Sequence, residues 1–234
     1  MVDSRLPRDM IRALAVRGYD AIALPPLPSL PSAIASHPDT LIFRHGKRLI
    51  STADYCDVAA FVFSDVRERC SEYGISFTAD ELGSVFPRDC ILNAAVIGDK
   101  LFCKTDSISR AVLEYAERAG LRVVHTRQGY PACATLILDG AHAVTADRGL
   151  AEIYERHGIE AIVIEDGGIS LPPYKSGFIG GASGVFGKEI FFIGDVSTHP
   201  SEKIIRDTAE RLGFKLVSLG GGMLADLGGL IFLD

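Results

Sequence analysis

The stretch "TADRGLAEIYERHGIEAIVIE", residues 145–165, repeats in outline an earlier stretch, "KTDSISRAVLEYAERAGLRVVH", residues 104–125. Both run from an Asp through an amphipathic segment to a Gly and then into a run rich in β-branched residues. A Gly followed by an apolar residue is typical of the end of a helix, because Gly readily adopts a positive φ there. The pair therefore predicts a repeating unit that closes with a helix and a strand.

The same helix-ending pattern occurs five times along the chain. Its glycines are Gly18, Gly74, Gly120, Gly158 and Gly213, and strand-like runs follow them: "YDAIAL", "ISFTA", "LRVVH", "IEAIVI" and "FKLVSL". An Asp precedes each helix, namely Asp3, Asp54, Asp106, Asp147 and Asp195. Because a short carboxylate caps free N–H groups at a helix start, we expect these five aspartates to be structural.

Four predicted β-hairpins stand before the helices: "TLIFRHGKRLIST", "AAVIGDKLFCKT", "TLILDGAHAVTA" and "GVFGKEIFFIG". Their turns contain Gly46, Gly98, Gly140 and Gly187, which we expect to supply positive φ angles. A fifth hairpin results if the end of the chain, "GGLIFLD", pairs with its start, "MVD". Such pairing leaves no open end in need of a cap.

The sequence thus predicts one α/β domain over residues 1–234, built as a closed ring of five strand–strand–helix–strand units. The expected units cover approximately residues 229–234 plus 1–25, 40–80, 93–126, 134–166 and 184–220. One unit is shared by the two termini.

This arrangement resembles the pentein fold, the five-bladed β/α propeller of the guanidino-group-modifying enzymes and of the ribosome anti-association factor of eukaryotes and archaea. The segment "FPRDCILNAAVIGDKLF", residues 86–102, is similar to the start of one blade in arginine-modifying members. The segments "SLPPYKSGFIGGASG", "SHPD" and "GYPAC" resemble an uncharacterised bacterial branch of the fold. The resemblance implies a fold and no established activity.

Function is expected where the units converge, in the loops that leave the last strand of each unit. These loops are "PPLPSLPSAIASHPD", "ELGSVFPRDCILN", "TRQGYPACA", "DGGISLPPYKSGFIGGAS" and "GGGMLADLGG". Loops on a rigid scaffold often carry function, and long ones especially so. We expect them to form a small-molecule pocket; the alternative is that they only fill the axis.

The resemblance to guanidino-modifying penteins implies a nucleophilic Cys in the loop before the final strand, a His in another blade and carboxylates that hold a guanidinium group. In this sequence the first loop, "GGGMLADLGG", has no thiol, and the position of the His falls near Phe178. Only the carboxylate has a counterpart, Asp89. The covalent route of the family cannot be carried over at those positions.

Other side chains in the central loops are candidates for a site. Cys133 is the preferred nucleophile over Cys90, with His37 as its catalytic partner, although packing of the thiol and turn bonding of His37 to Asp39 are structural alternatives. The expected ligand-binding residues are Asp39, Asp89, Asn93, Tyr130, Asp166, Tyr174, Lys175 and Asp226.

Composition limits the partners. The net charge of −6 includes no Lys/Arg block, so we expect no nucleic-acid or anionic-membrane partner. Five cysteines without a C-x-x-C pair indicate a reducing, cytoplasmic setting, and no apolar run reaches the roughly 20 residues of a membrane span. No clustered His/Cys motif indicates a metal, and "GGGMLA" lacks the following helix that a dinucleotide cofactor requires. A homo-oligomer is compatible with the sequence.

Three interpretations stay open. The first is a small-molecule-binding pentein that hydrolyses an amidino, guanidino or amide compound with unfamiliar catalytic residues. The second is a non-catalytic binding or assembly protein that keeps the scaffold without the C-terminal nucleophilic Cys. The third is an open α/β sheet with an unrelated site.

Overall fold

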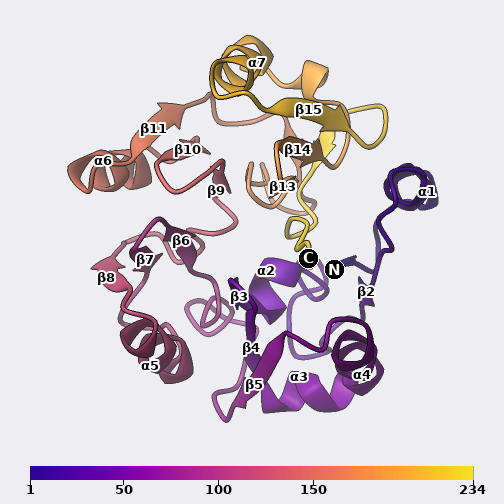
Figure 1. The fold of residues 1–234 in the computed structure, drawn as a ribbon, viewed down its shortest axis with the longest axis vertical. Helices are drawn as coiled ribbons and strands as arrows, with labels where there is room; N and C mark the ends of the chain where they lie inside the picture. Colours follow the sequence, from indigo (N-terminus) through magenta and orange to yellow (C-terminus); the bar gives the residue numbers. More distant parts are fainter. Residues whose placement is uncertain (234) are drawn as a thin grey trace.

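The computed structural model describes residues 1–233 as an α/β protein in which four sheets repeat one design (Figure 1). In each sheet two strands form an antiparallel hairpin and a third strand joins the second in parallel. The sheets are β3 (Phe43–His45), β4 (Arg48–Thr52) and β5 (Gly74–Thr78); β6 (Ala95–Ile97), β7 (Lys100–Cys103) and β8 (Arg122–His125); β9 (Thr135–Ile137), β10 (His142–Thr145) and β11 (Glu160–Val163); and β13 (Ser183–Phe186), β14 (Glu189–Phe192) and β15 (Lys215–Ser218).

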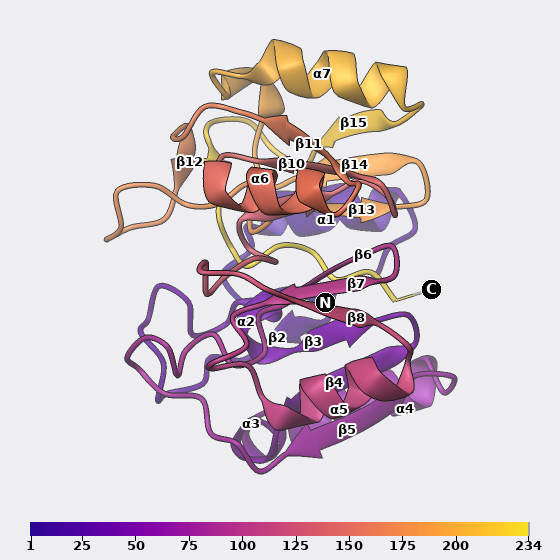
Figure 2. The same ribbon diagram turned by 90° about the vertical axis from the view of Figure 1, so that its left-hand side faces the viewer.

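Helices connect the second and third strands of each sheet and lie on the outside of the molecule (Figures 1 and 2). They are α3 (Ala53–Val58) with α4 (Ala60–Arg69), α5 (Arg110–Arg118), α6 (Arg148–Arg156), and the short 3₁₀ helix η1 (Val196–Thr198) with α7 (Glu202–Arg211). The two stretches that first suggested a repeat contain α5 with β8 and α6 with β11. Each helix buries one face against its sheet, as Val112 and Ala116 of α5 show.

The two ends of the described chain lie beside each other (Figure 1). Strand β1 (Val2–Asp3) pairs in parallel with β2 (Ala23–Leu24), and α1 (Arg8–Val16) connects them. The backbone N–H of Ile231 donates to the carbonyl of Met1 at 3.1 Å, and the amino group of Met1 donates to the carbonyl of Ile231. The predicted contact between the first and last segments is therefore present as two hydrogen bonds, and residues 230–233 have no strand assignment.

Three local predictions were wrong. Gly140 does not adopt a positive φ, because the side chain of Asp139 accepts hydrogen bonds from the N–H groups of Ala141 and His142 and shapes a longer turn. Gly74 does not end a helix, since α4 stops at Arg69 and Gly74 begins β5.

The third concerns the helix caps. Asp147 and Asp195 cap the first turns of α6 and η1 as expected. Asp3 does not, because it lies in β1 and its carboxylate binds the main-chain N–H and the guanidinium of Arg5. Asp54 lies inside the first turn of α3, and the N-cap of α5 is Ser109 in place of Asp106.

The connections after the last strands meet near the middle of the molecule and carry three further short elements. Helix α2 (Pro38–Leu41) follows β2, while β12 (Ile169–Ser170) and β16 (Leu224–Ala225) pair in parallel. Within residues 1–233, no helix is both long and apolar enough to span a bilayer.

Candidate functional site

A cavity of about 210 Å³ lies among the connections that follow β2, β8, β12 and β16; we call it the loop cavity. Its walls are largely apolar and aromatic, with a few polar groups, as in many small-molecule sites. The lining residues are Ile34, His37, Thr40, Tyr130, Cys133, Leu171, Tyr174, Ser176, Phe178 and Asp226.

Cys133, which is buried, lies in hydrogen-bonding contact with two residues from other connections. Its Sγ atom donates a hydrogen bond to Oδ2 of Asp39, and Nδ2 of Asn93 approaches the sulfur at 3.4 Å. Asn93 also donates to the main-chain carbonyl of Asp39 at 3.1 Å and accepts from the N–H of Ala132 at 2.9 Å. Asn93 therefore fixes the loop of Cys133 against the loop of Asp39.

His37 lies next to this pair and is 1% exposed. Neither ring nitrogen has a hydrogen-bond partner: Nδ1 lies 3.8 Å from Oδ1 of Asp226, and Nε2 lies 3.9 Å from Oδ2 of Asp3. A buried polar side chain without a partner is unusual and requires an explanation, because burial costs the group its hydrogen bonds to water. Gly228 allows the close packing, since its φ is 70° and a Cβ there would stand 2.4 Å from Cβ of His37.

Asp226 is held in the wall of the cavity by two main-chain donors. The N–H of Phe178 donates to Oδ2 at 2.8 Å and that of Gly228 to Oδ1 at 3.0 Å. The carboxylate is 1% exposed and lies in the loop where the sequence has no thiol. Each carboxylate oxygen keeps capacity for a further donor.

The buried environment shifts the protonation of all four groups. Burial, followed by the charge of Asp226, raises the pKa of Asp39 to about 7. Burial also raises the pKa of Asp226 to about 6 and lowers the pKa of His37 to about 4. Burial and the two nearby carboxylates raise the pKa of the Cys133 thiol well above its ordinary value. At neutral pH the thiol is protonated, the imidazole is neutral, and Asp39 is close to its midpoint.

The other predicted site residues differ in their position. Tyr130 lines the loop cavity, and its hydroxyl donates to Oδ2 of Asp89 at 2.7 Å. Asp89 therefore does not line the cavity itself but holds the side chain of Tyr130. Tyr174 lines the cavity and is 50% exposed. Asp166 and Lys175 are exposed and do not line it. The structure brings eight of the ten predicted residues to or beside the cavity and leaves these two outside.

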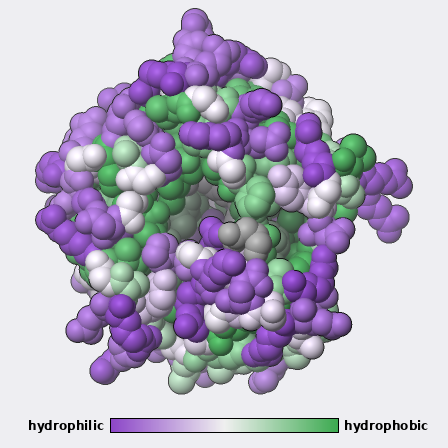
Figure 3. Space-filling view, viewed as in Figure 1, coloured by the Kyte–Doolittle hydropathy of each residue, from purple (hydrophilic) through white to green (hydrophobic). Residues whose placement is uncertain are grey.

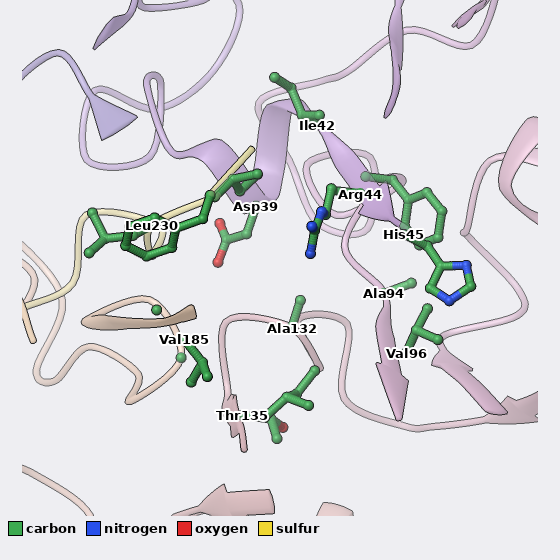
Figure 4. Close-up of a pocket in the computed structure, with 18 of the residues that line it drawn as sticks. Asp39, Ile42, Arg44, His45, Ala94, Val96, Ala132, Thr135, Val185 and Leu230 are labelled. Atoms are coloured by element: carbon green, nitrogen blue, oxygen red, sulfur yellow. The ribbon is translucent and has the colours of Figure 1, made fainter. Parts of the chain in front are cut away.

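Asp39 also faces a second cavity, of about 360 Å³, on the side of the hairpin turns; we call it the hairpin cavity. Its walls include residues from the first strand of each hairpin and residues 230–232. Figure 3 shows this face, which is hollowed near its centre where hydrophobic residues gather, while hydrophilic residues occupy the periphery. In Figure 4 the carboxylate of Asp39 and the guanidinium of Arg44 both project into this cavity. Asp39 thus lines the hairpin cavity and contacts Cys133, which lines the loop cavity.

Two residues near the cavity were missed from the sequence. Asp3 is fully buried behind His37, and Arg5 binds both of its carboxylate oxygens and the carbonyls of Ser32 and Ala33. Asp3 was interpreted as a helix cap, and no local signal in the sequence indicates that β1 brings it to the loop of His37.

Comparison with known proteins supports the architecture. A family model described as "Family of unknown function (DUF6873)" matches residues 1–231. The chain belongs to this family. No protein in the comparison with curated sequences matches the DUF6873 chain.

Solved structures of guanidino-group-modifying enzymes share its fold. DDAH from Pseudomonas aeruginosa, solved with citrulline, matches with a TM-score of 0.55 at 15% identity, over 89% of this chain and 77% of that chain. SxtG, an amidinotransferase from Microseira wollei, matches with a TM-score of 0.53 at 12% identity, over 97% of this chain and 83% of that chain. The N-terminal domain of ArgZ, covalently bound to a reaction intermediate, matches with a TM-score of 0.51 at 10% identity, over 92% of this chain and 79% of that chain.

These matches confirm that the DUF6873 chain has an α/β fold of the pentein type. At such identities the likeness establishes the fold alone. The chemistry of the site has to be argued from its own residues.

Proposed function

We propose that this protein binds a small, flat cation of the amidino or guanidino class in the loop cavity and hydrolyses it with Cys133 as the nucleophile. The observation that carries the proposal is that the thiol of Cys133, the imidazole of His37 and the carboxylate of Asp226 line one cavity, while the carboxylate of Asp39 accepts the hydrogen bond of the thiol. The related structures are of enzymes whose names refer to guanidino and amidino compounds, which supports the choice of ligand class.

Binding rests on Asp226 and on the aromatic walls. Because Asp226 keeps free lone pairs on both oxygens, it is able to accept a bidentate pair of N–H groups from a guanidinium. Tyr130 and Phe178 lie on the same cavity, with ring centroids 6.4 Å apart, and aromatic faces attract a cation placed over them.

The charge of the cavity lining indicates that the ligand carries no carboxylate. Among the described residues that line it, the one titratable base is His37, whose pKa of about 4 leaves it neutral. A ligand carboxylate would find no cationic partner in the lining. We therefore expect agmatine, or an amidine without a carboxylate, to bind better than arginine.

Asp39 is the base of the proposed reaction. It already accepts the hydrogen bond of the Cys133 thiol, and its pKa of about 7 suits proton transfer at neutral pH. As Sγ bonds to the amidino carbon, the thiol proton moves to Asp39. The carbon–nitrogen bond to the leaving group then breaks, and the departing ammonia or amine takes that proton.

The second half of the reaction uses water. Water adds to the amidino carbon of the thioester-like intermediate and gives a proton to His37, whose neutral ring nitrogens are unpartnered. The carbon–sulfur bond breaks, Sγ takes the proton held by His37, and the remaining hydroxyl proton passes to the released ammonia or amine as the carbonyl of the product forms. One guanidino compound and one water thus give one ureido compound and one ammonia or amine, and an amidine gives an amide in place of the ureido compound.

A non-catalytic binding protein is the second candidate, and one observation favours it. No hydrogen bond joins His37 to Cys133, and burial keeps the thiol protonated, so the sulfur is not activated in the unliganded protein. A bound cation changes this, because it favours the ionised forms of nearby groups.

The proposed location of the site depends on closure of the ring. We propose that the four repeated units and the terminal segments form the closed, five-bladed β/α propeller expected from the sequence. Support comes from the two hydrogen bonds between Met1 and Ile231, and from the hairpin cavity, whose walls combine the first strands of four hairpins with residues 230–232.

The proposal is tested by incubating the protein with agmatine, arginine, methylated guanidines, alkyl amidines and simple amides, while ammonia release and ureido products are measured. We expect product from a compound without a carboxylate and an adduct on the Cys133 peptide by mass spectrometry. Cys133→Ala should form neither, and Cys90→Ala, whose buried thiol lies outside the loop cavity, should form both. Binding of agmatine without product or adduct would favour the non-catalytic protein.

A further inference from the structure

We propose that His37, Asp39 and Cys133 bind one divalent transition-metal ion of the zinc class at the inner end of the loop cavity. The sequence shows no metal motif, because His37 and Asp39 lie in one connection and Cys133 lies 94 residues after Asp39 in another. The fold brings one ligand atom of each residue to within 4.8 Å of the others.

The spacing suits an ion after small side-chain rotations. Zinc bonds of about 2.0–2.2 Å to nitrogen and oxygen and about 2.3 Å to sulfur place tetrahedral ligand atoms roughly 3.3–3.6 Å apart. The ligand atoms lie within 4.8 Å of one another, and Sγ of Cys133 is 2.5 Å from Oδ2 of Asp39, so the longest separation closes and this short one opens by about an ångström. The imidazole, carboxylate and thiolate set is one that zinc and cobalt accept.

His37 supplies the independent observation that a ligand belongs here. Its ring is 1% exposed, and neither nitrogen has a partner. Nδ1 lies 3.8 Å from Asp226 and Nε2 lies 3.9 Å from Asp3. Whichever nitrogen binds the ion, the other faces a carboxylate, and metal-bound histidines usually donate their second N–H to such a group.

The surroundings also suit a cation. Asn93 approaches the sulfur through an N–H donor at 3.4 Å, which stabilises a thiolate ligand. Three carboxylates, those of Asp3, Asp39 and Asp226, lie around the imidazole and thiol, and the guanidinium of Arg5 binds one of them, Asp3. Three protein ligands leave a fourth position, which would open to the cavity as in metal sites that keep an exchangeable ligand.

Metal binding and the proposed thiol hydrolysis compete, because coordination lowers the nucleophilicity of the sulfur and occupies the carboxylate of Asp39, the proposed base. The ion would therefore inhibit the hydrolysis wherever that reaction occurs. The proposed metal site does not depend on the hydrolysis, because metal binding is measured on the protein without substrate.

The experiment is a titration of chelator-treated, full-length protein with Co²⁺, followed by absorption spectroscopy. We expect one equivalent to produce the near-ultraviolet thiolate-to-cobalt band and the visible bands of a tetrahedral ion, and Zn²⁺ to displace them. The thiolate band should disappear in Cys133→Ser. The variants His37→Gln and Asp39→Asn keep the approximate size of each side chain, and their apparent affinity for Co²⁺, measured from the same bands, should be at least tenfold lower.

Cys90→Ser is the matched control, because this buried cysteine of a neighbouring connection does not line the loop cavity, and it should give the wild-type spectrum. Absence of a thiolate band at one equivalent would overturn the proposal. So would a band that persists in Cys133→Ser or is unaffected in His37→Gln. Circular dichroism confirms that each variant is folded before it is titrated.

Discussion

The Sγ atom of Cys133 donates a hydrogen bond to Oδ2 of Asp39, a residue 94 positions away in the sequence. The contact joins the connection after β8 to helix α2, and it links Cys133, which lines the loop cavity, to Asp39, which lines the hairpin cavity. It pairs a buried thiol with a carboxylate whose pKa, near 7, allows it to take the proton. The predictions below follow from this pair and its surroundings.

Asp39→Asn should stabilise the protein above pH 7. The pKa of Asp39 is about 7 in the folded protein and 3.8 in the unfolded chain, so the stability that this group contributes is present below pH 3.8 and is lost as the pH rises to about 7. The amide keeps the acceptor for the thiol and removes the buried charge. We expect a gain of about 1–3 kcal/mol at pH 8, falling to near zero at pH 4, in urea unfolding.

Asp166→Asn is the control for that measurement, because Asp166 is exposed and does not line the loop cavity. Its stability should follow the wild type at every pH. An Asp39→Asn variant that is less stable than the wild type at pH 8 would contradict the raised pKa of this carboxyl.

Cys133 should resist alkylation in the unliganded protein. Burial and the adjacent carboxylates raise the pKa of its thiol, and the thiolate is the reactive form. Cys56 and Cys70 are partly exposed and should react first with iodoacetamide near neutral pH. Peptide mass spectrometry over time gives the order of labelling, and labelling of Cys133 before both of them would show that its thiol is activated.

Asp226→Ala should destabilise the protein by about 2–4 kcal/mol, because it leaves the N–H groups of Phe178 and Gly228 buried without their acceptor. Asp226→Asn keeps one acceptor oxygen and should lose less. Thermal unfolding of the two variants beside the wild type measures the difference, and equal losses would mean that the carboxylate does not hold the loop.

Arg5→Met should cost about 1–3 kcal/mol of stability, since it leaves the fully buried carboxylate of Asp3 without its cation. The partial exposure of the guanidinium places the value below that of a fully buried pair. The double variant Arg5→Met with Asp3→Asn should recover most of the loss. A double variant less stable than Arg5→Met would show that the ion pair is not the source of the effect.

The repeated strand–strand–helix–strand pattern in the sequence predicted most of the sheets and helices. Some positions require glycine because their backbone has a positive φ, and these can be recognised in a sequence. Examples are Gly98 and Gly187 in hairpin turns and Gly158 after α6. Gly140 was misjudged because the side chain of Asp139 supplied a competing turn, and side-chain hydrogen bonds of this kind depend on the exact conformation.

The site was harder to predict than the fold. Cys133, His37 and Asp226 were found because they stand in loops that the repeat places at one end of the units. Asp3 and its partner Arg5 were not, because neither the two-residue strand β1 nor the turn after it shows in the sequence which loop it will contact. Asp166 and Lys175 stand in the same connection as Tyr174 but are exposed and do not line the cavity, a difference that loop composition cannot reveal.

Calorimetric titration with agmatine between pH 5.5 and 8 tests the central claim, a cation site formed by Asp226 beside Cys133, most directly. A cation binds the ionised carboxylates, whose pKa values are about 6 and 7, so its affinity should rise as the pH increases through that interval and then level off. Binding at one site per chain should be lost in Asp226→Asn and retained in Asp166→Asn. Unchanged affinity in Asp226→Asn, or no binding of agmatine at pH 8, would contradict the account.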